Sequence, residues 1–193
     1  KEIWGVPCPM FVRSIGMEGA IGPVAGSSHH SLYHRMPGVK IKSPMTPLEY
    51  KRVYEEFMSE DEVYYVSEHR GSYGNSDELE NIFFDDPDLC IFCISITRFT
   101  AVEVSKFFLT KGIRISVHHI VDIKPLILSD RDYESAKKSQ KILVIDDDYE
   151  NGISRNIAYE IHTKTNCKIN TLGLKDKTAG FHPRVDNLPP SKE

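Results

Sequence analysis

The sequence predicts an α/β protein with two lobes, each built on a mostly parallel sheet. Short apolar runs rich in β-branched residues alternate with amphipathic helical patterns along the 193 residues. The alternation falls into two blocks, and the polar stretch from Glu68 to Asp88 with its glycines and proline separates them. Because repeated strand–helix units form parallel sheets with right-handed crossovers, we expect one sheet from each block.

The first block is expected to form three strands and two helices. The strands are predicted at Met10–Arg13, Val39–Ile41 and Val63–Val66. A glycine-rich loop, Ser14–Gly26, does not fit a phosphate-binding motif, and the helix after it, Ser28–Arg35, carries three histidines. The second helix is predicted to start with a capping box, with Thr46 as the cap, Pro47 in the first turn and Glu49 as the reciprocal partner.

The second block is expected to form four strands, at Cys90–Ile94, Ile113–Ile120, Ile142–Ile145 and Lys168–Leu172. Between them we predict helices over Thr100–Lys111, Arg131–Ser139 and Ile153–Thr163. Thr100 and Glu103 have capping-box spacing, and Gly112 is a suitable end for the first of these helices.

Charge and cysteine usage exclude some classes of protein. The net charge is −4 with both signs interspersed, so no nucleic-acid or membrane partner is expected. No apolar run approaches the ~20 residues needed to span a bilayer, and the first residues lack the features of a signal peptide. Cys90 and Cys93 should point to opposite faces of one strand and pack as core residues, which favours a reducing, cytoplasmic location.

Asp146, Asp147 and Asp148 directly follow a predicted buried strand, where ligands bind in open α/β sheets. The run Lys141–Asp148 resembles the metal-binding first strand of a response-regulator receiver domain, but the rest of the chain lacks the later aspartate and lysine that such a domain requires. We therefore expect the carboxylates to accept backbone hydrogen bonds or to favour the positive helix start near Ile153. No metal ligands are assigned from the sequence.

Five segments, in this order and spacing, resemble the transketolase superfamily, most closely the beta subunit of thiamine-diphosphate-dependent 2-oxo-acid dehydrogenases. They are Pro9–Arg13; Met36–Pro47; Ser67–Tyr73; Gly112-Ile113 followed by Val121–Leu126; and Ile142–Asp147 with Asn151-Gly152-Ile153. The resemblance implies that residues 1–75 are the second half of a pyrimidine-binding domain, that 76–87 are a linker, and that 88–193 are a transketolase C-terminal domain.

The resemblance also implies thiamine diphosphate and Mg²⁺ as cofactors of the complete enzyme. The half-domain that carries the cofactor-activating glutamate in the family is not in this sequence, and the diphosphate–Mg²⁺ site belongs to another domain or subunit. This chain alone is therefore not expected to bind the cofactor, and a cofactor-binding partner in a homo- or hetero-oligomer is expected. The sequence does not begin with Met, which leaves open that it is a fragment.

The resemblance yields three candidate site residues. The family places a catalytic histidine in the glycine-rich loop; an ungapped count back from Pro37 gives Ala25, and the nearest imidazoles are His29 and His30. Such a histidine would shuttle a proton at neutral pH. Arg13 matches a strand-end arginine that would hold a carboxylate or phosphate, or it is a simple ion-pair partner. Ala25 and the missing glutamate favour the alternative function, a non-catalytic α/β module for assembly or regulation.

Overall fold

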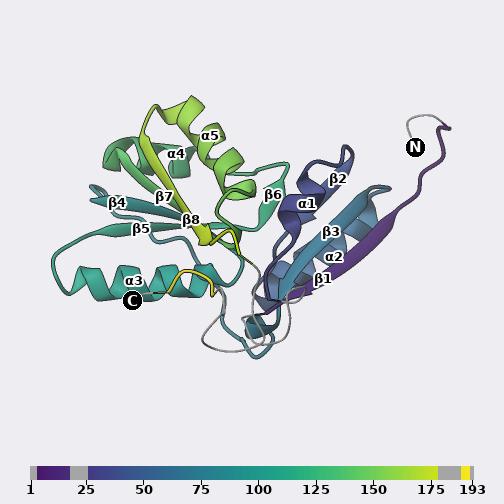
Figure 1. The fold of residues 1–193 in the computed structure, drawn as a ribbon, viewed down its shortest axis with the longest axis horizontal. Coiled ribbons are helices and arrows are strands. Elements are labelled where there is room, and N and C mark those ends of the chain that lie inside the picture. Colours follow the sequence, from purple (N-terminus) through teal and green to yellow (C-terminus); the bar gives the residue numbers. More distant parts are fainter. Residues whose placement is uncertain (1–3, 18–25, 178–187, 192–193) are drawn as a thin grey trace.

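The computed structural model describes residues 4–17, 26–177 and 188–191, which form two lobes packed side by side (Figure 1). Each lobe contains a four-stranded sheet. No helix in these ranges is both long and apolar enough to cross a membrane.

The sheet of the first lobe has the strand order β1-β3-β2-β6. Strands β1 (Met10–Gly16) and β2 (Val39–Lys42) are both parallel to β3 (Val63–His69). Strand β6 (Asp122–Lys124) is antiparallel to β2, although it comes from the second block of the sequence. The second block therefore supplies an edge strand to the first lobe.

Two helices belong to this lobe, α1 (His30–His34) and α2 (Pro47–Ser59). Helix α2 covers one face of the sheet, where Val53 packs against Tyr64 and Val66 and the Phe11 ring stacks on Tyr54 at 4.7 Å. Strand residues alternate between faces. The opposite face, which carries Tyr65, therefore turns toward α1 and the second lobe.

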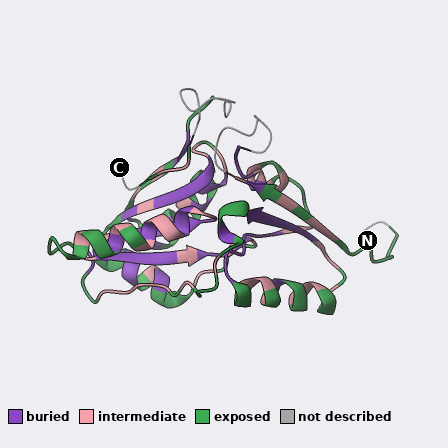
Figure 2. Cartoon of the chain, turned by 90° about the horizontal axis from the view of Figure 1, so that it is seen from below, coloured by how far each residue is buried: buried purple, intermediate pink, exposed green. Residues whose placement is uncertain are grey.

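The sheet of the second lobe is entirely parallel, with the order β5-β4-β7-β8. Its strands are β4 (Leu89–Ile94), β5 (Ile115–Ile120), β7 (Lys141–Tyr149) and β8 (Lys168–Leu174). Helix α3 (Thr97–Leu109) lies on one face, and α4 (Asp130–Ser139) and α5 (Ile153–Thr165) lie on the other (Figure 1). Because both faces are covered, the central strands are buried almost throughout, which explains their continuous apolar sequence (Figure 2).

The two lobes share one apolar core. Ile41 and Tyr65 of the first sheet belong to the same buried cluster as Phe92 of β4 and Ile157 of α5. The predicted linker also packs onto the second lobe, because Ile82 pairs with Val117 of β5 through two backbone hydrogen bonds of 2.8 Å. The largest apolar cluster is therefore common to both lobes, and two smaller clusters lie under α2 and α3.

The predicted faces of the two strand cysteines are confirmed. Cys90 packs in the cluster that includes Ala136 of α4, and Cys93 packs with Ala101 of α3 on the other side of the sheet. Both are buried and free, as is Cys167.

The predicted capping boxes at Thr46 and Thr100 are both wrong. Thr46 does occupy the N-cap position of α2, but its hydroxyl makes no cap hydrogen bond. The Glu49 carboxylate instead accepts from the Met45 N–H at 2.9 Å and pairs with Arg98 of α3. Helix α3 begins at Thr97, three residues earlier than expected, because the left-handed backbone of Ser95 (φ 55°) turns the chain straight from β4 into the helix.

Candidate functional site between the lobes

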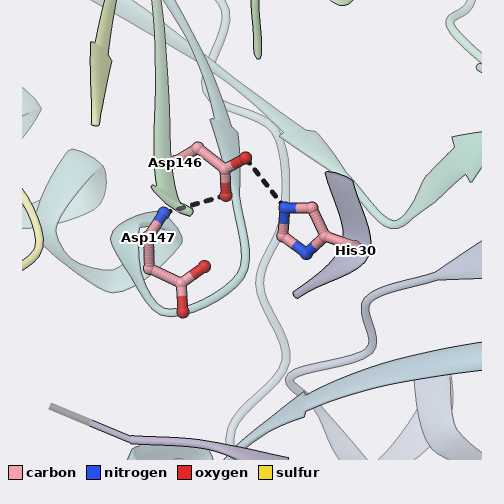
Figure 3. Close-up of side chains that lie close together, drawn as sticks. All are labelled: His30, Asp146 and Asp147. Carbon is pink, nitrogen blue, oxygen red and sulfur yellow. Dashed lines mark hydrogen bonds and ion pairs between the residues drawn. The ribbon is translucent and has the colours of Figure 1, made fainter. Parts of the chain in front are cut away.

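The carboxyl ends of β3 and β7 meet at the junction of the two lobes. Strand β7 runs four residues further than predicted, so Asp146, Asp147 and Asp148 are part of the strand rather than of a loop. All three are buried, with exposed fractions of 0, 1 and 3%. Helix α1 of the first lobe lies against them, with its first residue, His30, completely buried (Figure 3).

The His30 ring joins the two lobes. Its Nε2 lies 2.8 Å from Asp146 Oδ2 and 3.7 Å from Asp148 Oδ2, both in the second lobe. Its Nδ1 lies 3.1 Å from Ser67 Oγ on β3 of the first lobe. Both ring nitrogens therefore contact protein groups.

Asp147 also faces the first lobe. Its Oδ2 accepts a hydrogen bond from Ser28 Oγ at 2.8 Å, and Nε2 of His69 at the end of β3 is 3.9 Å from the same oxygen. Two histidines of one lobe thus face the acidic strand end of the other.

The predicted backbone hydrogen bonds to these carboxylates are confirmed for two of the three. Asp146 Oδ1 accepts from the Asp147 N–H at 2.8 Å, and Asp148 Oδ2 accepts from the Ser31 N–H at 3.0 Å. The aspartates do not accept a hydrogen bond from the first residue of α5. The Ile153 N–H donates to Ser31 Oγ at 2.9 Å instead.

Burial and charge shift the pKa values in this cluster strongly. Burial alone would lower the pKa of His30, but the charge and hydrogen bond of Asp146 outweigh it and raise that pKa to about 9. Burial, reinforced by the charge of Asp146, raises the pKa of Asp147 to about 8. The site can therefore hold a proton or another positive charge among its carboxylates.

Arg13 lies in a different environment. Its Nη2 donates to Glu68 Oε2 at 2.8 Å and its Nε to Oε1 at 2.5 Å, while the Tyr73 hydroxyl donates to Oε2 at 2.7 Å. The hydrogen bonds and charge of Glu68, which is completely buried, raise the pKa of Arg13. A cavity of about 320 Å³ beside this pair is lined also by Thr46 and Tyr50.

The structure does not bring Arg13 and His30 into one site. Along β1 and its partner β3, Arg13 and Glu68 share the face that α2 covers, whereas Ser67, the partner of His30, lies on the opposite face. His29 precedes α1 and is half-buried. Ala25 lies outside the described residues.

Sequence reasoning missed the pairing of His30 with Asp146. The histidine and the aspartates are each visible as candidates in the sequence, but 116 residues separate them. The pairing of His118 with Asp132 was also not predicted from the sequence. His118 Nδ1 lies 2.7 Å from Asp132 Oδ1 in the buried interior of the second lobe.

No protein-family model matches the sequence, and a comparison with curated proteins finds no match. Similarity is found among solved structures. A structure described as a split-gene transketolase, inactive beta4 tetramer, matches with a TM-score of 0.67 at 16% identity, covering 86% of this chain and 57% of that one.

Two longer transketolases match as well. The enzyme from Campylobacter jejuni gives a TM-score of 0.63 at 14% identity, and a mutant of the Pichia stipitis enzyme gives 0.66 at 15%. The matches cover 91% and 93% of this chain but only 28% of each enzyme. The chain therefore spans less than two thirds of each of the three, and what it shares with them is a transketolase-like α/β fold with two mostly parallel sheets.

Proposed function

We propose that this chain is a subunit or part of a thiamine-diphosphate-dependent transketolase-like enzyme that acts on 2-oxo acids or ketoses, most like the beta subunit of a 2-oxo-acid dehydrogenase. One observation carries the proposal: both lobes, packed on a common core, match transketolases in a single superposition. In this assignment residues 1–75 are half of a pyrimidine-binding domain, 76–87 the linker and 88–193 a C-terminal domain.

The cavity beside Arg13 does not fit the diphosphate of the cofactor. Arg13, which lines it, is already neutralised by the buried Glu68 carboxylate, and that carboxylate would repel an anionic ligand. We therefore propose that a partner subunit or a further domain supplies the sites for thiamine diphosphate and Mg²⁺. In the complete enzyme, the cofactor would provide the electron sink for cleavage next to a carbonyl.

His29 is the better of the two histidine candidates for proton transfer. It is half-buried, whereas His30 has no exposed surface and contacts protein groups at both nitrogens. A group that contacts substrate must be reachable by it. In this proposal His29 moves a proton, His30 positions the two lobes, and the Arg13–Glu68 pair orders the cavity wall for a substrate oxygen.

The second candidate function is a non-catalytic module for assembly or regulation. The burial of His30 favours it, since a histidine held in this way serves the contact between the lobes. The description of one similar structure as an inactive tetramer is compatible with it.

Calorimetry of the intact protein with its natural partner separates the two functions. The enzyme proposal expects saturable binding of thiamine diphosphate in the presence of Mg²⁺ by the assembly and none by this chain alone. His29→Ala should then lower turnover at a temperature where the variant remains folded, while His30→Gln should lower the melting temperature. If the complete assembly fails to bind the cofactor, the catalytic proposal is wrong, and the non-catalytic module is the remaining candidate.

A further inference from the structure

We propose that His30, Asp146 and Asp147 bind a divalent cation that links the two lobes. One ligand atom from each of the three lies within 4.8 Å of the other two, a separation that a single metal ion can bridge. His30 belongs to the first lobe and both aspartates to the second, so the cation would connect the sheets (Figure 3). The proposal does not depend on the thiamine-dependent function.

The first argument is the balance of charge. Three carboxylates at the end of β7 are almost completely buried. Their ion-pair partners among the described residues are the imidazoles of His30 and His69, and no lysine or arginine there pairs with them. Since an unbalanced buried charge is costly, a site of this composition favours a bound cation.

The second argument is a buried oxygen that lacks a partner. Asp147 Oδ1 is buried but has no hydrogen-bond partner of suitable geometry among the described residues. Buried polar atoms are rarely left without partners unless a water or an ion satisfies them. The Asp147 oxygen is therefore available as a ligand atom.

The third argument is the orientation of the imidazole. Its Nδ1 is 3.1 Å from Ser67 Oγ, which fixes the ring from the side away from the carboxylates. Without a metal, Nε2–H faces Asp146 Oδ2 at 2.8 Å, and a bound cation would replace that proton. Metal-binding histidines are held in this way by a hydrogen bond at the other ring nitrogen.

The ligand set indicates which cation to expect. One imidazole nitrogen with two carboxylates suits Mn²⁺, Fe²⁺ or Zn²⁺, whereas Mg²⁺ and Ca²⁺ prefer oxygen ligands alone. This set of ligands could not be predicted from the sequence, because the three residues come together only when the two lobes pack.

Metal analysis and thermal unfolding test the proposal on the intact protein after EDTA treatment and dialysis. Mn²⁺ or Zn²⁺ should bind with one equivalent per chain after gel filtration and should raise the melting temperature, with Mg²⁺ at least tenfold weaker. Asp147→Asn should weaken Mn²⁺ binding at least tenfold. Because asparagine is neutral and nearly the same size as aspartate, this variant should fold at least as stably as the metal-free wild type.

Asp132→Asn is the matched control, because Asp132 is also a buried carboxylate that pairs with a histidine, but it lies away from the junction of the lobes. It should retain Mn²⁺ binding. The proposal is overturned if the wild type retains neither Mn²⁺ nor Zn²⁺ and its melting temperature does not move. It is equally overturned if Asp147→Asn binds Mn²⁺ as tightly as the wild type. Neither result bears on thiamine diphosphate binding.

Discussion

The ion pair between Arg98 and Glu49 joins α3 of the second lobe to α2 of the first, and its removal should be costly. The Arg98 side chain is completely buried, and that of Glu49 is 14% exposed. Arg98 Nη1 donates to Glu49 Oε2 at 2.8 Å, and Nη2 donates to Oε1, so the contact is bidentate. We expect Arg98→Met to destabilise the protein substantially, because it leaves a carboxylate without its cation.

The size of the effect follows from what remains around Glu49. Breaking a buried pair by removing one partner costs about 3–5 kcal/mol. Glu49 keeps the hydrogen bond from the Met45 N–H and some contact with water, which places the loss near the lower limit, at about 3 kcal/mol. Each 1.4 kcal/mol is tenfold, so the folding equilibrium should shift on the order of 100-fold.

Urea unfolding followed by circular dichroism measures this loss. The one tryptophan, Trp4, is 83% exposed and would report poorly on the core by fluorescence. Arg114→Met is the matched control, since Arg114 is 42% exposed and pairs with Asp86 and Asp88 at the surface. It should cost less than about 1 kcal/mol. If Arg98→Met costs no more than this control, the interlobe ion pair does not have the role assigned to it.

Two further predictions concern the second lobe. Burial lowers the pKa of His118, but the hydrogen bond with Asp132 and the nearby Cys90 outweigh burial and raise the pKa above its ordinary value of 6.5. The pair of protonated His118 and Asp132 therefore stabilises the fold fully below pH 6.5, and this stabilisation is lost as the pH rises through the folded-state pKa. The stability lost in His118→Gln, measured by urea unfolding, should therefore shrink with rising pH. An unchanged difference from about pH 5 to about pH 9 would contradict this assignment. Gly152→Ala should cost about 1–3 kcal/mol, because the new Cβ would lie 2.9 Å from the backbone oxygen of Tyr149. The open position Gly74 serves as its control, and its alanine variant should stay within about 0.5 kcal/mol of the wild type; equal melting temperatures for the two variants would refute the steric argument.

Local patterns in the sequence predicted the elements well. The apolar runs located β4 and β7, and the spacing of Cys90 and Cys93 gave their opposite faces. These predictions succeeded because the alternation of side chains along a strand is a local property. The start of α2 at Pro47 was also predicted correctly. Its capping box was not, because Glu49 pairs with tertiary partners instead, and α3 begins three residues before the predicted start at Thr100.

The sequence by itself determined two α/β blocks, an acidic run directly after a buried strand, and a histidine-bearing segment before Pro37. Only the tertiary structure decided what those polar groups do. It assigned Glu49 to Arg98 and His30 to Asp146, and it placed Arg13 with Glu68 on the other face of the sheet. The physical reason is that a buried charge is stable only when it is paired, and tertiary packing decides which group lies close enough to pair with it. The packing of two lobes cannot be predicted from the spacing of neighbouring residues.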